Sequence, residues 1–141
     1  MRNIRKGSHT LYDHKYHIVF CTKYRKKILR GEIALRIRDI IRRVCEDFGV
    51  EILKGNIRDN HIHLLLSIPA HHSISKIVQH MKDLSSRRLQ QEYIEIRKQY
   101  WGKHLWSRGY FSATTGTVTD EMISDYIDSQ TEEDDNFRVG Y

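Results

Sequence analysis

The centre of the chain reads Val50-Glu51-Ile52-Leu53-Lys54-Gly55-Asn56-Ile57-Arg58-Asp59-Asn60-His61-Ile62-His63-Leu64-Leu65-Leu66-Ser67-Ile68. Its two halves, residues 50–57 and 61–68, are rich in aliphatic and β-branched side chains and predict two strands. The polar residues 58–60 between them suit a tight turn. The segment therefore predicts a β-hairpin, in which the two strands pair with one another.

The segments before the hairpin predict one strand and one helix. Residues 14–22 are aromatic and β-branched, as strands usually are. Residues 32–48 carry apolar side chains at three- and four-residue spacing, which is the period of a helix with one buried face. Gly49 follows directly and is expected to end that helix.

The segments after the hairpin complete the pattern with a helix and a strand. Ser73 is placed to cap a helix over about residues 73–92, and residues 109–115 read as a fourth strand. The order β-α-β-β-α-β is that of the ferredoxin-like α+β fold, an antiparallel sheet with helices on one face. We assign this core to residues 14–115, within a single domain over residues 1–141.

An added helix is expected after the core. Thr119 can cap it, and Asp120 and Glu121 lie in its first turn, where the helix dipole favours acids. We assign this helix to residues 117–130 and treat residues 131–141 as an acidic tail.

The charge of the chain is divided unevenly. The formal net charge is +6, but residues 1–119 hold 23 of the 24 basic side chains and only ten acidic ones, a net +13. The remaining eight acids are Asp120, Glu121, Asp125, Asp128, Glu132, Glu133, Asp134 and Asp135. A body this basic predicts a polyanionic partner, most simply nucleic acid. A basic protein with an ordinary solvated surface is the alternative.

Nothing in the sequence predicts a membrane protein. No apolar run approaches the roughly 20 residues that a membrane helix needs, and the basic N-terminus lacks the apolar segment of a secretory signal. Cys21 and Cys45 match no metal or redox spacing. We therefore expect a cytoplasmic protein with reduced thiols and no membrane partner.

Two histidines in the second hairpin strand are the most informative local feature. Because strand side chains alternate in direction, His61 and His63 project from one face of the strand. The aliphatic side chains beside them project from the other face, where they can pack under helices: Ile62, Leu64 and Leu66. Two imidazoles on one face can hold a divalent metal ion if a third ligand comes from elsewhere. The alternative is a pair of partly exposed histidines beside a core strand.

The added helix offers a candidate for that third ligand. Tyr126 and Gln130 are four residues apart and so share one helix face. Ile123 and Ile127 form a neighbouring apolar stripe that would dock the helix. A glutamine amide oxygen is an acceptable ligand for a hard metal ion, and a tyrosine one turn away can hold its hydroxyl near the same ion. A packed tyrosine and a solvated glutamine are the alternative.

With these residues in place, the chain resembles the single-tyrosine HUH transposases of the insertion sequence 200/605 family. HUH denotes two histidines that flank one hydrophobic residue. The likeness runs over about residues 10–130, and its motifs are specific when taken together in this order. They are Tyr-His-Ile-Val-Phe-Cys-Thr-Lys-Tyr-Arg at 16–25, Asp-Asn-His-Ile-His-Leu-Leu at 59–65, Leu-Trp-Ser-Arg-Gly-Tyr-Phe at 105–111, and Gly-Thr-Val-Thr through Tyr-Ile-Asp-Ser-Gln within 116–130.

The resemblance implies a role for four residues. Tyr126 matches the nucleophile of the family, His61 and His63 match its metal ligands, and Gln130 matches the third ligand. It further implies a covalent 5′-phosphotyrosine and a free 3′-hydroxyl, with Mg²⁺ as the cofactor and Mn²⁺ as the second choice. Coordination chemistry alone favours Mn²⁺, Co²⁺ or Zn²⁺, because imidazoles are softer than the ligands that Mg²⁺ usually binds.

The partner implied by the resemblance is single-stranded DNA with hairpins at the ends of a mobile element. The family acts as a homodimer, in which the tyrosine helix of one chain can serve the histidines of the other. Single strands are bound by cationic grooves with aromatic faces. The side chains that suit this role are Lys23, Arg25, Lys26, Lys27, Arg87, Arg88, Lys103, Trp106 and Arg108, with Tyr100 and Trp101 in the same basic and aromatic segment. For the tryptophans, burial in the core is the alternative.

Two other functions stay open at this point. One is a related HUH nickase, such as a domesticated repeat-associated transposase or a replication initiator, although the short chain argues against an initiator. The other is a nucleic-acid-binding module without catalysis. That module would leave the histidine pair without a role, and the intact set of four residues therefore disfavours it.

Overall fold

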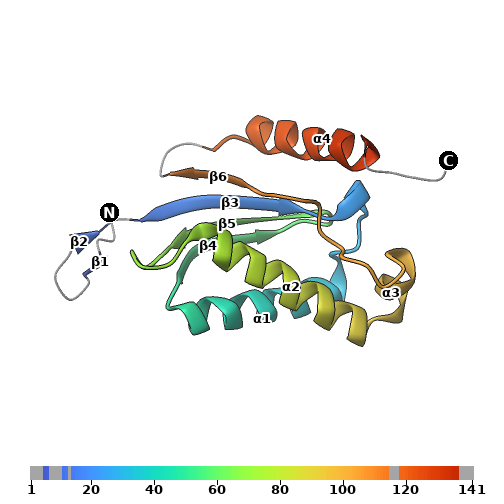
Figure 1. Ribbon diagram of the computed structural model, residues 1–141, viewed down its shortest axis with the longest axis horizontal. Helices are drawn as coiled ribbons and strands as arrows, with labels where there is room; N and C mark the ends of the chain where they lie inside the picture. The colour runs from blue at the N-terminus through green and yellow to red at the C-terminus, as the bar shows by residue number, and fades with distance from the viewer. Residues whose placement is uncertain (1–4, 7–10, 13, 115–117, 137–141) are drawn as a thin grey trace.

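The sheet has four antiparallel strands. A computed structural model of the chain describes residues 5–6, 11–12, 14–114 and 118–136, with the side chains of residues 14–114 and 118–130 (Figure 1). The sheet order is β4-β5-β3-β6, and every neighbouring pair is antiparallel. The strands are β3 (Lys15–Cys21), β4 (Glu51–Ile57), β5 (His61–Ser67) and β6 (Phe111–Thr114), preceded by a separate pair, β1 (Arg5–Lys6) and β2 (Leu11–Tyr12).

Two long helices cover one face of the sheet, and another lies along the opposite face (Figure 1). The first two are α1 (Gly31–Phe48) and α2 (Ile74–Glu92), and the helix on the opposite face is α4 (Asp120–Asn136). The βαββαβ order and the strand order together are those of the predicted ferredoxin-like α+β fold, with an added C-terminal helix. Among the residues that the structure describes, no helix is both long and apolar enough to span a membrane.

Local capping contacts set the helix boundaries and confirm the predicted caps. Gly49 ends α1 in the left-handed conformation, with φ +66°, which glycine adopts without a Cβ penalty. The Ser73 hydroxyl accepts a hydrogen bond from the Lys76 amide at 3.2 Å, at the start of α2. The Thr119 hydroxyl accepts one from the Met122 amide, also at 3.2 Å, at the start of α4.

Each face of the sheet has its own hydrophobic core. The large core lies under α1 and α2 and includes Ile18 and Phe20 from β3. The small core lies under α4 and joins Val19 and Cys21 from β3 with two α4 side chains, Ile123 and Ile127. Alternate residues of β3 therefore serve different cores, as strand geometry requires.

Two helices differ from the sequence-based assignment. The added helix was assigned to residues 117–130, but α4 runs from Asp120 to Asn136. Residues 131–136 contain neither glycine nor proline, so nothing in the acidic stretch stops the helix. A short helix, α3 (Ile94–Gln99), was not predicted, because six residues are too few to show a helical period.

Candidate active site

The two histidines of β5 lie on the sheet face that α4 covers. The large core buries their strand neighbours, Ile62 and Leu64, whereas His61 and His63 are half-buried on the opposite face. In the β3–β5 register, His61 pairs with Cys21, and His63 pairs with Val19. Both partners belong to the small core under α4. The predicted alternation is therefore confirmed, and it points both imidazoles toward the added helix.

Burial keeps both imidazoles in the form that binds metal ions. Desolvation lowers the pKa of His61 below its ordinary value, and Arg58 lowers it further, while Asp59 acts in the opposite direction. Desolvation also lowers the pKa of His63, and Asp120 opposes that shift. Because protonation is disfavoured, both side chains are neutral near pH 7 and each keeps a nitrogen lone pair.

A hydrogen bond orients each of the two rings. His61 Nδ1 lies 2.8 Å from the side-chain oxygen of Asn60, and since an amide oxygen only accepts, Nδ1 is the donor. His61 Nε2 then carries the lone pair. His63 Nε2 lies 3.1 Å from Nδ1 of His17 on β3, and the centroids of these two rings are 5.3 Å apart. Ligating histidines commonly have such a partner on the second ring nitrogen.

Sequence reasoning missed the part that His17 plays beside the histidine pair. The signal was present, because His17 lies two residues before Val19 and so on the same strand face. The β3–β5 register, which the sequence does not reveal, decides that this face meets His63.

The histidines line a cleft whose charged residues are three arginines and three aspartates. The cleft has a volume of about 850 Å³ and lies between the sheet, the turn before α1 and the helix α4. Arg25, Arg30 and Arg58 line it together with both histidines. Arg25 pairs with Asp128 of α4 at 3.1 Å, and Arg30 pairs with Asp59 at 3.4 Å. Guanidinium groups beside neutral imidazoles suit a phosphate group of nucleic acid.

Tyr126 lies on the other side of α4 from this cleft. The residues of α4 that line the cleft are Asp120, Ile123, Ser124, Ile127 and Asp128. The ring of Tyr126 instead contacts Phe111 of β6, with 6.1 Å between the ring centroids. Gln130 is 8% exposed and, like Tyr126, is absent from the cleft lining. Ile123 and Ile127 dock the helix as predicted, each with 8% exposure.

The strand pairing in the sheet gives an estimate of the distance between Tyr126 and the histidine pair. Phe111, Val19 and His63 form one row across three strands, because Val19 pairs with both of the others. Neighbouring strands are about 4.8 Å apart, so about 10 Å separates the two ends of this row. Tyr126 contacts Phe111 at the end farther from His63. Within the described residues, moreover, no three His, Cys, Asp or Glu side chains form a metal-binding cluster.

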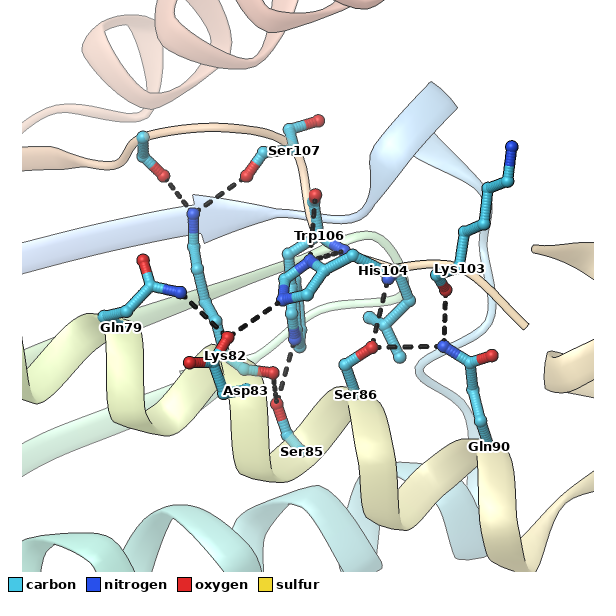
Figure 2. Close-up of polar contacts among 12 residues, drawn as sticks. Gln79, Lys82, Asp83, Ser85, Ser86, Gln90, Lys103, His104, Trp106 and Ser107 are labelled. Atoms are coloured by element: carbon cyan, nitrogen blue, oxygen red, sulfur yellow. Dashed lines mark hydrogen bonds and ion pairs between the residues drawn. The ribbon is translucent and has the colours of Figure 1, made fainter. Parts of the chain in front are cut away.

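One DNA-binding residue named from the sequence is in the core. Trp106 is 2% exposed, and its Nε1–H donates to Ser85 Oγ at 2.9 Å (Figure 2). Its ring packs edge-on against Phe20. In the same network the Lys82 ammonium donates to the carbonyl oxygens of Ser107 and Gly109 (Figure 2). Trp106 forms an antiparallel bridge with Thr22, which follows β3, and this pairing holds its side chain in the large core. The prediction that Trp106 contacts DNA directly is therefore wrong.

The basic candidates do not form one continuous surface. Arg25 lines the histidine cleft, whereas Arg87 and Lys103 line a separate depression of about 430 Å³ beside α2. Arg88 lines a third depression, between α1 and α2 on the far side of the sheet. The remaining candidates keep their charge at the protein surface: Lys23 and Lys26 are half-buried, and Lys27 and Arg108 are exposed.

The family of transposases described as IS200-like matches residues 10–130 of this chain. The chain belongs to this family. The ISDra2 transposase TnpA of Deinococcus radiodurans is 34% identical over 127 residues, which cover 90% of this chain and 91% of that protein. The transposase for insertion sequence element IS200 of Salmonella typhimurium is 39% identical over 127 residues, covering 90% of this chain and 83% of the relative.

Solved structures agree with this assignment. A crystal structure of a transposase from Deinococcus radiodurans superposes with a TM-score of 0.81 and 31% identity, covering 89% of this chain and 97% of the other. A tyrosine transposase solved in complex with a REP hairpin superposes with a TM-score of 0.55 and 15% identity, covering 92% of this chain and 66% of the other. At that identity the second likeness shows the shared fold alone.

Proposed function

We propose that this IS200-like transposase cleaves and rejoins single-stranded DNA at the ends of a mobile element, through a covalent phosphotyrosine at Tyr126. The observation that carries this proposal is the pair of neutral imidazoles, His61 and His63, in an arginine-lined cleft under the helix that bears Tyr126. The proposal extends to hairpin DNA, because a protein of the same fold was solved with a REP hairpin.

The chemistry assigned to Tyr126 is an in-line displacement. The phenolic oxygen attacks phosphorus, the bond from phosphorus to the 3′ oxygen breaks, and the departing oxygen takes a proton to become a 3′-hydroxyl. A free phenol has a pKa near 10, so its ionisation requires a nearby positive charge or a base. The product, a 5′-phosphotyrosine, keeps the free energy of the phosphodiester, so a 3′-hydroxyl can rejoin the strand without ATP.

The residues proposed to hold a divalent ion are His61, His63 and Gln130, with Mg²⁺ or Mn²⁺ as the ion. The donor set fits in part: two neutral imidazoles share one face, and each has its second ring nitrogen near a polar partner. When bound, such an ion would act as a Lewis acid that stabilises charge on phosphate oxygens. Arg25 and Arg58 would orient the same phosphate group from the rim of the cleft.

We further propose that the complete site is assembled between two chains. Within one chain, Tyr126 contacts Phe111, two strands away from His63, and neither Tyr126 nor Gln130 lines the cleft. Placing α4 of one chain over the histidines of a second chain would bring Tyr126 and Gln130 together with both imidazoles.

An adduct assay tests the chemistry. Labelled single-stranded hairpin DNA from the ends of the element is incubated with the protein and Mg²⁺ or Mn²⁺, and a denaturation-resistant protein–DNA adduct is expected. Tyr126→Phe or EDTA should abolish it, whereas the control Tyr93→Phe should form the adduct as the unmodified protein does. Binding without an adduct would instead favour the non-catalytic module, and an adduct without rejoining would favour a nickase.

Mixed dimers test the assembly. Chains with Tyr126→Phe are combined with chains that carry His63→Ala, so that each lacks one half of the site. If the site forms between chains, one of the two sites in the mixed dimer regains all four residues and adduct formation returns. Mixed dimers that stay inactive would contradict the assembly between chains while leaving the adduct chemistry intact.

A further inference from the structure

The two tryptophans of the chain are in opposite surroundings. Trp106 is 2% exposed in the large core, whereas Trp101 is 71% exposed. Trp101 is thereby the most exposed large hydrophobic side chain in the described part of the molecule. From the sequence, each tryptophan could be either a core residue or a DNA-binding residue. In the structure, Trp106 is buried and Trp101 is exposed.

A rarely adopted backbone conformation accompanies this exposure. The φ angle of Trp101 is +54°, in the left-handed region that disfavours residues with a Cβ atom. Among the described residues, only Tyr24 and Arg25 are also non-glycine residues with positive φ, at +60° and +52°. Strain of this kind persists only where surrounding contacts hold it, and it gathers at ligand-binding sites.

Hydrogen bonds join the two strained segments into one surface corner, formed by residues 23–26 and 99–103. The Tyr100 hydroxyl donates to the carbonyl oxygen of Lys23 at 3.0 Å. The Lys26 ammonium donates to the carbonyl oxygen of Gln99, also at 3.0 Å. All three positive-φ residues therefore lie in a single corner that is fixed by long-range contacts.

Lys26 places a positive charge against the exposed ring. Its Nζ lies 5.5 Å from the centroid of Trp101 and 5.3 Å from that of Tyr100, which is buried. The corner thus combines a large exposed aromatic surface with a fixed cation. Proteins bind single-stranded nucleic acid with this pair of features, stacking a base on the ring and attracting a phosphate to the charge.

The corner adjoins the histidine cleft. Arg25, the residue before Lys26, lines the cleft and pairs with Asp128 of α4. Consecutive Cα atoms are about 3.8 Å apart, so Lys26 of the corner lies directly beside the cleft residue Arg25. A strand with one phosphate in the cleft can therefore continue across the corner.

We propose that Trp101 is a stacking site for an unpaired base of single-stranded DNA, beside the cleft, with Lys26 holding the adjoining phosphate. This inference rests on the proposed function only for the identity of the nucleic acid. It assigns the corner to unpaired bases, since bases inside a duplex are already stacked on both faces.

Tryptophan fluorescence tests the proposal directly, because the chain has only two tryptophans and Trp106 is buried. The full chain is titrated with a short oligothymidylate in EDTA, which prevents cleavage. Saturable quenching is expected, and Trp101→Phe should remove it. A blunt duplex, which has phosphates but no unpaired bases, should quench much less. Absence of quenching at saturating oligothymidylate, or equal quenching by the duplex, would overturn the stacking site.

Affinity measured by anisotropy of a labelled oligothymidylate gives a second readout. Trp101→Ala should weaken binding about ten-fold, and Trp101→Tyr should keep most of the affinity because it keeps an aromatic face. The matched control is Leu35→Ala, which truncates another exposed apolar side chain (53% exposed) without a lysine over it, and should change nothing. Equal affinities for Trp101→Ala and the control would contradict the proposal. Thermal melting of each variant checks that it is folded.

The two proposals fail in different ways. Tyr126→Phe should form no adduct yet show the same fluorescence quenching as the unmodified chain. If no DNA gives an adduct but oligothymidylate still quenches Trp101, the transposase chemistry is wrong and the stacking site stands. If an adduct forms without any quenching, the stacking site alone is wrong.

Discussion

The two faces of the sheet differ in how much they bury and in what they carry. Among the described side chains, the face under α1 and α2 holds a core of 22 buried residues, and the face under α4 holds four. The same strands build both faces, since β5 gives Ile62 and Leu64 to the first and His61 and His63 to the second. One face therefore holds the fold together, and the other is left to carry polar groups.

This difference bears on how tightly α4 is held. Ile123 and Ile127 are the buried apolar side chains in the part of α4 whose side chains are described, and burying two isoleucines contributes about 3–6 kcal/mol as an upper estimate. A helix anchored in this way can leave its own sheet without unfolding the core, as an active site assembled between chains would require.

The largest expected effect is a difference between substitutions at two neighbouring residues of β5, one on each face of the sheet. Ile62→Ala should lower the free energy of unfolding by about 2–5 kcal/mol, because it leaves a cavity in the large core. His63→Ala should abolish adduct formation while changing stability by less than about 1 kcal/mol. Urea unfolding and the adduct assay measure the two effects. A large loss of stability in His63→Ala would show that both faces support the fold equally.

Each face of the sheet buries one cysteine, so the labelling rate of each thiol measures how often that face opens. Cys45 lies in the large core, where burial raises the pKa of its thiol to about 12, and Cys21 lies under α4. Labelling of single-cysteine variants with a thiol reagent should be faster at Cys21, because lifting α4 costs less than global unfolding. Ile127→Ala should speed labelling of Cys21 by ten-fold or more, since it weakens the anchor by about 2 kcal/mol, and leave Cys45 unchanged. Equal acceleration at both thiols would mean that α4 opens only with the whole fold.

The sequence predicted the large core more completely than the site. Alternation in β5 and the helical period of residues 32–48 follow from local geometry, so the ferredoxin-like order and the direction of His61 and His63 could be read from the chain. The pairing register of the strands could not be read from the chain. For that reason the contact of His17 with His63 and the distance of Tyr126 from the cleft could not be predicted either. Trp106 was misassigned because an aromatic residue in a basic segment looks the same whether it is buried or exposed.

A smaller effect is expected at the hydrogen bond between His17 and His63. His17→Ala removes the group 3.1 Å from His63 Nε2 and frees that ring to rotate. Loss of such a partner usually weakens metal binding by about 10–100-fold, and we expect the lower end because Asn60 still orients His61. Titration with Mn²⁺, followed by the electron paramagnetic resonance of the free ion, measures the affinity. His80→Ala, an exposed histidine on the other face, is the control, and equal affinities for the two variants would refute the positioning role.

The smallest effect concerns the ion pair that ties α4 to the cleft. Arg25 and Asp128 lie 3.1 Å apart, but both side chains are well exposed, so the pair contributes at most about 1 kcal/mol. Asp128→Asn should therefore speed labelling of Cys21 only a few-fold. Added salt should speed labelling in the unmodified chain by a similar factor and have little effect on the variant. Asp125→Asn removes the same charge from an exposed position of α4 and serves as the control. If both variants label Cys21 at one rate, the net charge of the helix, not its bond to Arg25, sets how readily that face opens.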